Sequence, residues 1–517
     1  MARDKIALII GAGPAGLSAA YHFLMETEDI KPVILEKFDC IGGISRTIWN
    51  NASGTDIGPH RLFSKNQDVI DLWEKLLPLQ GKGAIDDKIL NRITTLSENG
   101  PDPDEVNNVM LKRRRLSRIY YLKHFFDYPV SLNFTTILNL GIVRTFMAGF
   151  SYLKSCVHKI PENSLEDFMI NRFGCVLYQM FFEKYTEKVW GVHPSKISKE
   201  WGEQRIKGIS LSKVLLNAIL SPLKSISKKD KETSLIEEYY YPKYGCSQLW
   251  QVMLDKILAM GGEIYYNTTV SQINTKDNKV FSVSAISNNN ETTYVADYLV
   301  SSMPINELIA GLNNVPEEVK YIAENLQYRD YILASYLCKG INLPNNTKFL
   351  TINNIAPDSW IYLQEDFIKA GRIYIMNNFS PYMIKDFQNN VLVNLEYFCN
   401  EGDELWSKSE AEMLDFGLNE FKKLGVLGSD NIIESRCVKV QKAYPAYFGV
   451  YKDFDKVKNY LNTIKNLYCI GRNGQHKYNN MDHSILSGMK VADVIKNNLP
   501  IDLLWSVNTE QEYHEAK

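Results

Sequence analysis

The residues near the N-terminus have the types and spacing that bind a dinucleotide. An apolar run over 5–10 leads into Gly11-Ala12-Gly13-Pro14-Ala15-Gly16, and Glu36 closes a second apolar run twenty residues after Gly16. Gly11 permits a tight turn, Gly13 lets the backbone approach a pyrophosphate, and Gly16 lets a helix lie close to the sheet. The first amides of that helix would face the phosphates, and Glu36 would accept hydrogen bonds from a ribose. The pattern therefore predicts a dinucleotide-binding βαβ unit.

A second glycine pair follows the ribose-binding acid, in Lys37-Phe38-Asp39-Cys40-Ile41-Gly42-Gly43-Ile44-Ser45-Arg46. This stretch resembles the motif that contacts FAD in glutathione-reductase-like and amine-oxidase-like flavoproteins. NAD-dependent dehydrogenases generally lack it, and the chain has no second GxGxxG for a separate nicotinamide-binding domain. We therefore expect FAD as the cofactor, with Lys37, Gly43, Ile44 and Ser45 among its contacts.

The surrounding patterns predict the elements that position these residues. Strand and helix signals alternate over about the first 75 residues, apolar residues recur at helical spacing from about 132 to 223, and strand-like runs dominate from about 328 to 447. A strand over 467–470 and a helix over 484–497 would return to the first sheet. We expect an α/β protein with a Rossmann-like, glutathione-reductase-like FAD-binding domain, a helical subdomain and a second, mainly antiparallel β-sheet domain.

These patterns also suggest how the chain is divided. The FAD-binding domain would be discontinuous, and a largely helical cap and the second sheet would bind substrate. The expected segments are 1–80, 240–305 and 465–500 for the FAD-binding domain, 81–239 for the cap, 306–464 for the β-sheet domain and 501–517 for a C-terminal tail. Within the cap, the polar segment 81–118 is expected to be an insertion or long loop, and 225–231 a lysine-rich connector.

Composition excludes several classes of function. The net charge of -2 gives no reason to expect nucleic acid or an anionic membrane as the main partner. Eight cysteines form no CxxC pair, so a zinc site or disulfide framework is not indicated, and a reducing cytoplasm fits best. The first strand leaves no room for a secretory signal, and the apolar stretch 137–150 is interrupted by Arg144 and too short to span a bilayer. The basic run 112–115 with Arg118 is either a solvated loop or a contact for an anionic substrate or surface.

The segment Asp56-Ile57-Gly58-Pro59-His60-Arg61-Leu62-Phe63-Ser64 resembles the histidine loop beside the flavin in UDP-galactopyranose mutases. Other segments resemble mutase segments in the same order across nearly the whole chain, most closely those of the longer eukaryotic form. They are Tyr128-Pro129, Lys188-Val189-Trp190, Trp201-Gly202-Glu203-Gln204-Arg205, Tyr241-Pro242-Lys243-Tyr244-Gly245, Ser301-Ser302-Met303, Trp360-Ile361-Tyr362, Phe379-Ser380-Pro381-Tyr382, Tyr444-Pro445 and Asn480-Met481-Asp482-His483-Ser484. The wider superfamily also contains amine oxidases and protoporphyrinogen oxidases.

This resemblance implies a flavin-dependent isomerase acting on a nucleotide sugar, with a role in surface polysaccharide biosynthesis. In such mutases reduced FAD attacks the anomeric carbon through N5 and expels the nucleoside diphosphate, and the sugar recloses as the furanose without net redox change. An FAD-dependent oxidoreductase of the amine oxidase or protoporphyrinogen oxidase type is the alternative. A flavin-bound protein with only a binding role is a third reading.

The resemblance also assigns candidate site residues. Arg205 would hold the diphosphate bidentately, and Lys339 stands where the family has its second phosphate-binding arginine, unless Arg372 contributes instead. Tyr328, Tyr444 and Tyr478 match tyrosines that contact the diphosphate or lie by the flavin, and His60 would have a conformational or hydrogen-bonding role there. Further expected cofactor contacts are Gly58, Val270, Gly471, Arg472, Asn480, Met481 and Ser484.

Several points stay open at this level. His476 and His483 lie seven residues apart, but no carboxylates occur at ligand spacing, so we expect no metal. Asn480 and Ser484 either cap the last helix or belong to a helix end that directs its amides at the flavin. Departures from the mutase pattern at Pro59, Lys339 and Met481 leave the sugar and nucleotide undetermined. A transient reductant such as NAD(P)H and a homo-oligomer are also left open.

Overall fold

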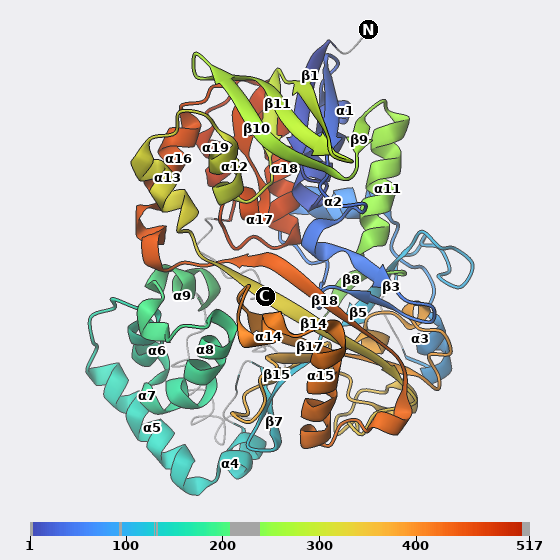
Figure 1. Ribbon diagram of the computed structural model, residues 1–517. Helices are drawn as coiled ribbons and strands as arrows, with labels where there is room; N and C mark the ends of the chain where they lie inside the picture. The colour runs from blue at the N-terminus through green and yellow to red at the C-terminus, as the bar shows by residue number, and fades with distance from the viewer. Residues whose placement is uncertain (1–3, 93–95, 129, 131–132, 207–237, 509–517) are drawn as a thin grey trace.

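The computed structural model describes residues 4–92, 96–128, 130, 133–206 and 238–508. The connector expected at 225–231 lies outside these residues. Figure 1 shows a parallel sheet with its helices at the top, a second sheet below it, and a group of helices at the lower left. The three parts meet near the middle of the molecule, where segments distant in sequence approach one another.

The first sheet is parallel throughout, in the order β19-β13-β1-β2-β9. Its strands are β1 (Lys5–Ile10), β2 (Ile30–Leu35), β9 (Glu263–Tyr265), β13 (Tyr298–Ser301) and β19 (Leu467–Cys469). Because successive side chains point to opposite faces, Ala7 and Ile9 enter one apolar cluster while Leu8 and Ile10 enter another. Both faces are covered, which explains why the strands are apolar without alternation.

Different elements cover the two faces of the parallel sheet. One face carries four helices, namely α1 (Pro14–Glu26), α2 (Gln67–Leu76), α11 (Cys246–Ala259) and α18 (Met481–Lys496). The other carries an antiparallel three-stranded sheet and three helices: β10 (Thr268–Lys276), β11 (Lys279–Ser287), β12 (Asn290–Val295), α12 (Ile305–Gly311), α13 (Glu317–Glu324) and α16 (Phe454–Asn462). The C-terminal tail expected from 501 begins with α19 (Asp502–Trp505), in which Leu504 and Trp505 are buried.

The second sheet has the order β18-β14-β17-β16-β15-β6-β7 and is antiparallel except between β15 and β6. Its strands are β6 (Ser117–Tyr121), β7 (His124–Asp127), β14 (Tyr328–Cys338), β15 (Trp360–Leu363), β16 (Arg372–Ile375), β17 (Val391–Cys399) and β18 (Ile432–Pro445). Helix α15 (Glu410–Leu424) packs on one face. The sequence placed neither β18 nor β6 and β7, the two strands that the 81–239 segment adds at one end of the sheet.

The helical subdomain contains α4 (Phe134–Leu140), α5 (Ile142–Val157), α6 (Leu165–Phe173), α7 (Cys175–Tyr178), α8 (Lys184–Trp190) and α9 (Lys199–Ile206). Ser164 begins α6 with a reciprocal capping box to Asp167, so the chain specifies that start locally. The core of the subdomain reaches Tyr362, Tyr444 and Tyr478, beside the junction of the two sheets. No single described helix has the length and apolar character needed to cross a membrane.

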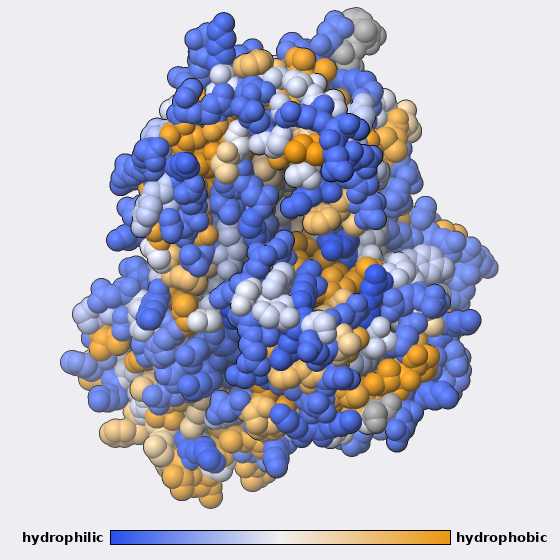
Figure 2. All heavy atoms as spheres, in the orientation of Figure 1, coloured by the Kyte–Doolittle hydropathy of each residue, from blue (hydrophilic) through white to orange (hydrophobic). Residues whose placement is uncertain are grey.

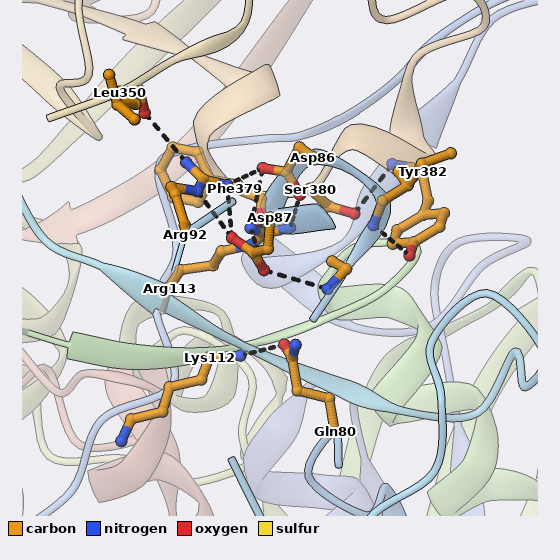
Figure 3. A network of polar contacts seen from close by, with 12 residues as sticks. Gln80, Asp86, Asp87, Arg92, Lys112, Arg113, Leu350, Phe379, Ser380 and Tyr382 are labelled. Carbon is orange, nitrogen blue, oxygen red and sulfur yellow. Dashed lines mark hydrogen bonds and ion pairs between the residues drawn. The ribbon is translucent and has the colours of Figure 1, made fainter. Parts of the chain in front are cut away.

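The basic run Lys112-Arg113-Arg114-Arg115 is mostly built into the fold, so the solvated-loop interpretation is wrong. It lies on and just after β5 (Met110–Arg114), which pairs with β8 (Glu238–Pro242). The Arg113 guanidinium, only 4% exposed, donates two hydrogen bonds to Asp86 on α3 (Ile85–Leu90) at 3.1 Å (Figure 3). Burial alone would raise the pKa of Asp86, but Arg113 and Arg92 hold it below its ordinary value.

The other arginines near this run differ in exposure. Arg118 pairs with the buried carboxylate of Asp358 through Nε at 2.9 Å, so its charge is also neutralised inside the fold. Arg114 is exposed and its guanidinium stacks on the Phe349 ring at 4.6 Å. Arg114 is therefore the exposed arginine of this run that remains available to contact an anionic ligand or surface.

Candidate functional site

A cavity of about 590 Å³ lies where the parallel sheet, the second sheet and the final helix meet. Its wall combines the turn after β1, the end of β2, the loop at 59–63, and β10 with strands β15 and β16 of the second sheet. Residues of the segment 471–484, near the C-terminal end of the chain, also line the cavity. Consequently, residues separated by several hundred positions face one space.

The end of the cavity formed by the parallel sheet has the features expected of a dinucleotide site. Helix α1 begins at Pro14, so its first amides lie at the cavity wall. Glu36 lines the same wall, and its carboxylate accepts hydrogen bonds from the backbone amides of Ala12 at 2.6 Å and Phe38 at 3.0 Å. Burial raises the pKa of Glu36, and those amides counteract the rise.

The three glycines of the first motif have different physical roles. Gly11 has φ +97°, a conformation that glycine adopts readily. A Cβ on Gly16 would lie 1.9 Å from the Gly11 carbonyl oxygen, so Gly16 is needed for helix and strand to pack. A Cβ on Gly13 would have its nearest neighbour, Gly43 Cα, at 3.8 Å. Gly13 therefore leaves room beside the cavity that the fold itself does not need, which fits a pyrophosphate.

The opposite end of the cavity is formed by charged and aromatic side chains of the second sheet. Arg372 lines it from β16, with Nε 2.5 Å from Oε2 of Glu396 on β17. A guanidinium nitrogen of Arg372 also donates to the Tyr444 hydroxyl at 3.1 Å. Burial raises the pKa of Glu396, although Arg372 opposes the rise. The pair fixes the guanidinium of Arg372 at the cavity wall.

Arg472 provides a second guanidinium in the cavity. Its Nε donates to the Asn479 carbonyl at 2.7 Å and another nitrogen to the Ala443 carbonyl at 2.9 Å. The group lies over the rings of Tyr478 at 4.9 Å and Tyr444 at 5.4 Å, and these two rings stack on each other. Within the described part of the chain, no carboxylate lies within ion-pairing distance of Arg472. Its charge is therefore available to an anionic ligand.

His60 lies at the cavity wall as a neutral imidazole. Burial, together with the charges of Arg472 and Arg372, lowers its pKa to about 3. Its buried Nδ1 has no hydrogen-bond partner among the described residues. At neutral pH the ring can donate through one nitrogen and accept through the other. The side chain adds polarity without adding a third positive charge.

Most of the cofactor-site residues expected from the sequence line this cavity. They are Gly11, Gly13, Pro14, Ala15, Glu36, Lys37, Gly43, Ile44, Ser45, His60, Val270, Gly471, Arg472, Asn480, Met481 and Ser484, and Tyr478 lines it too. Gly16 lies behind the wall in α1, and Gly58, with φ +138°, lies beside His60. Tyr444 lies behind Arg372 and Tyr478, against both of them.

Two other candidates, Tyr328 and Lys339, are not brought to the cavity wall. Tyr328 begins β14, with its ring 4.8 Å from His476. Lys339 follows the opposite end of that strand, is exposed, and donates its backbone N–H to the Asn431 carbonyl. Eleven steps of extended chain separate the two positions by roughly 35 Å, so they cannot contact one diphosphate. Arg205 falls in α9, but its side chain lies outside the described part of the structure.

Some residues of the cavity region were not predicted as site residues from the sequence. Glu396 gave one usable signal, because it is a lone carboxylate inside the apolar run of β17. Arg61 was part of a recognised segment, but its stacking on Trp360 at 4.1 Å needs strand β15 to come beside the 59–63 loop. Neither pairing could be found from spacing, since each joins elements far apart in the chain.

Two clusters contain residue types that bind metals. Asp56, His60 and Cys246 form one, and Glu166, Glu183 and His193 form the other. In the first, the Asp56 carboxylate already accepts hydrogen bonds from Thr47, Tyr241 and the Cys246 amide. Burial also keeps the pKa of the Cys246 thiol well above its ordinary value. Hydrogen bonding accounts for that cluster, and the expectation of no metal stays a prediction.

His476 predicts an acid sensitivity of the fold. The ring is 0% exposed, its Nε2 donates to the Ala446 carbonyl at 3.2 Å, and burial lowers its pKa to about 4. Unfolded histidine titrates near 6.5, so between pH 6.5 and 4 only the unfolded chain takes up this proton, and stability falls on acidification by up to about 1.4 kcal/mol per pH unit. We expect His476→Asn, which suits the φ of 45°, to flatten this fall in denaturant titrations. The exposed His158→Asn should keep the wild-type slope, and an unchanged slope in His476→Asn would refute the assignment.

Comparisons with known proteins agree with this architecture. Residues 14–496 match the family described as flavin containing amine oxidoreductase. A crystal structure of reduced UDP-galactopyranose mutase is similar with a TM-score of 0.76 at 20% identity, covering 98% of this chain and 100% of that one. A putative protoporphyrinogen oxidase from Exiguobacterium sp. 255-15 has a TM-score of 0.66 at 13% identity, with 96% and 99% covered. Putrescine oxidase bound to putrescine has a TM-score of 0.58 at 13% identity, with 96% and 100% covered. These likenesses confirm the predicted fold class and resemblance.

Proposed function

Because the chain belongs to the flavin containing amine oxidoreductase family, which implies a flavin cofactor, we propose that it binds FAD and acts as a nucleotide-sugar mutase. The reaction would interconvert pyranose and furanose forms of a sugar attached to a nucleoside diphosphate. FAD would lie along the cavity, with its ribose at Glu36 and its pyrophosphate at Gly13 and the start of α1. The flavin ring would reach the end formed by the second sheet.

The observation that supports a phosphorylated substrate most directly is Arg472. Its guanidinium lies over Tyr444 and Tyr478 beside Arg372 and the neutral His60, and no described carboxylate pairs with it. An arginine that is uncompensated inside a cavity is well suited to phosphate oxygens, which it can bind with two parallel hydrogen bonds. An aliphatic amine is protonated at neutral pH and would be repelled by that charge.

The chain's own residues would position the substrate and neutralise the charge of its diphosphate. Arg472 would bind the diphosphate both as part of the substrate and as the leaving group. Burial raises the pKa of Tyr444 to about 12, so its phenol keeps its proton, accepts from Arg372 and would hold that guanidinium in place from behind the cavity wall. Met481 and Asn480, at the start of α18, would lie by the flavin ring, where the helix terminus favours negative charge. When bound, reduced FAD would supply the nucleophilic nitrogen for exchange at the anomeric carbon.

A turnover assay tests this function. The purified protein is reduced with dithionite, supplied with UDP-galactopyranose, UDP-arabinopyranose or UDP-glucose, and the products are separated by chromatography. We expect a furanose product from at least one sugar in the reduced protein and none in the oxidised protein. The reductant should be consumed in proportion to protein and not to product, because the isomerisation has no net redox change.

The family also contains oxidases, so the same preparation is tested for them. Oxygen-dependent release of peroxide with an amine such as putrescine, without turnover of any nucleotide sugar, would contradict the mutase proposal. It would favour the alternative of an FAD-dependent oxidoreductase of the amine oxidase type. Both assays are referred to the flavin content, so that loss of cofactor is not mistaken for a missing activity.

A further inference from the structure

Helix α5 (Ile142–Val157) is amphipathic in the sense opposite to that of an ordinary surface helix. Its inner face consists of smaller or polar side chains, with Ala148, Tyr152 and Ser155 buried. Its outer face consists of large apolar side chains. At 100° per residue they fall within an arc of about 140° that lies opposite Ala148 and Ser155. They are Ile142 at 70% exposure, Val143 at 73%, Phe146 at 76%, Met147 at 56%, Phe150 at 74%, Leu153 at 64% and Val157 at 91%.

The short helix before it continues this surface. In α4, Phe134 is 75% exposed and Leu138 is 63% exposed. Figure 2 shows apolar atoms gathered at the lower edge of the molecule, where Figure 1 places α4 and α5. We call the nine exposed apolar residues of these two helices the α4–α5 face. Soluble monomers rarely expose contiguous apolar patches of this kind unless they are contact sites.

Within the stretch of chain that forms the α4–α5 face, the charged residues are of one sign. From residue 128 to residue 161 the chain has no aspartate or glutamate, whereas Arg144, Lys154 and Lys159 are cationic and exposed. By the same angular count, Lys154 lies within the apolar arc, whereas Arg144 lies about 60° beyond its edge. Long basic side chains beside an apolar stripe can bury their methylene stems while their charged ends reach lipid headgroups.

We propose that the α4–α5 face docks this protein on the surface of an anionic lipid bilayer. The apolar side chains would enter the boundary between headgroups and acyl chains, and the three cations would contact anionic headgroups. The helices would lie on the bilayer and not cross it, because α5 is about 24 Å long and α4 bends away from it by 109°.

A second copy of the chain fits the same face less well. A two-fold interface would place the face of one copy on that of the other. Arg144 and Lys154 would then approach the same cations of the partner copy, with no acidic residue in the 128–161 stretch to pair them. A lipid surface offers both an apolar layer and negative charge, so the observations favour it.

Vesicle flotation tests the proposal on the full-length protein. Vesicles of phosphatidylcholine with phosphatidylglycerol are compared with vesicles of phosphatidylcholine alone, at low and high salt. We expect the protein to float with the anionic vesicles and Phe146→Asp/Phe150→Asp to lower the bound fraction at least tenfold. Lys154→Glu should weaken binding to the anionic vesicles much more than to the neutral ones.

The matched control is Phe281→Asp/Val295→Asp, which replaces two exposed apolar residues on β11 and β12 at the other end of the molecule (Figure 1). It should bind vesicles like the wild type, and thermal unfolding should show that both double variants are folded. Failure of the wild type to float would overturn the proposal, as would equal losses in the two double variants. A wild-type dimer that Phe146→Asp/Phe150→Asp converts to a monomer, with no vesicle binding, would show that the face pairs copies instead.

Discussion

Arg472→Ala is expected to lower kcat/KM for a nucleotide sugar by about 100-fold or more, the scale on which removal of one charge-stabilising donor acts. The guanidinium combines hydrogen bonds to the Asn479 and Ala443 carbonyls with ring contacts to Tyr444 and Tyr478. No described carboxylate competes for its charge, so the ligand would receive it undiminished. Turnover is measured on dithionite-reduced protein and expressed per bound flavin, because Arg472 also lines the cofactor cavity.

Arg472→Lys is the matched variant for this prediction. It keeps the charge but loses the planar fork, so we expect it to retain part of the activity lost in Arg472→Ala. Isothermal titration with UDP then separates binding from chemistry, since loss of the diphosphate contact should weaken UDP binding too. Unchanged kcat/KM and UDP affinity in Arg472→Ala would show that the diphosphate binds elsewhere in the molecule.

Gly13→Ala is expected to remove most of the bound flavin while leaving the protein folded. A Cβ at this position meets no atom of the protein closer than 3.8 Å, so the polypeptide can accept it. The same methyl group would occupy the space assigned to the pyrophosphate at the start of α1. We expect FAD affinity to fall at least tenfold, equivalent to about 1.4 kcal/mol. Flavin absorbance after dialysis measures this loss, and circular dichroism measures the fold.

Two other glycine variants bracket that result. Gly149→Ala, on the exposed side of α5 with no neighbour within 4 Å, should keep wild-type flavin content. Gly16→Ala should instead destabilise the fold, because its Cβ would lie 1.9 Å from the Gly11 carbonyl oxygen. Full flavin content in Gly13→Ala would place the pyrophosphate away from the first helix.

The first βαβ unit was predictable because every signal for it is local. The order strand, glycine turn, helix, strand and Glu36 is confirmed as β1, α1 and β2, with Glu36 at the cavity. The strand-like runs predicted from about 328 to 447 are confirmed by β14, β15, β16 and β17, because short apolar runs between breakers identify strands directly. In contrast, β6 and β7 were expected within a loop and a helical cap, since their role depends on pairing with β15, more than 230 positions away.

Charged residues were the least predictable from the chain alone. The run at 112–115 is polar in sequence, but α3 supplies Asp86 to Arg113 across the fold, so that its charge is buried. Lys339 was assigned to a phosphate site because it stands where the family has its second phosphate-binding arginine. The direction of β14, which runs away from the cavity, decides against that assignment.

By itself, the sequence determined the type of cofactor site and the elements that hold it, because glycines, caps and apolar periods act over a few neighbouring residues. Only the tertiary structure decided which charges remain available. Arg372 and Glu396 neutralise each other on adjacent strands, whereas Arg472 meets carbonyls and rings but no described carboxylate. Likewise, α5 has an ordinary amphipathic pattern, and only its packing shows that the apolar side faces outward. Charge compensation and burial depend on contacts between segments that are far apart in the chain. Local sequence patterns do not show which of these segments come into contact.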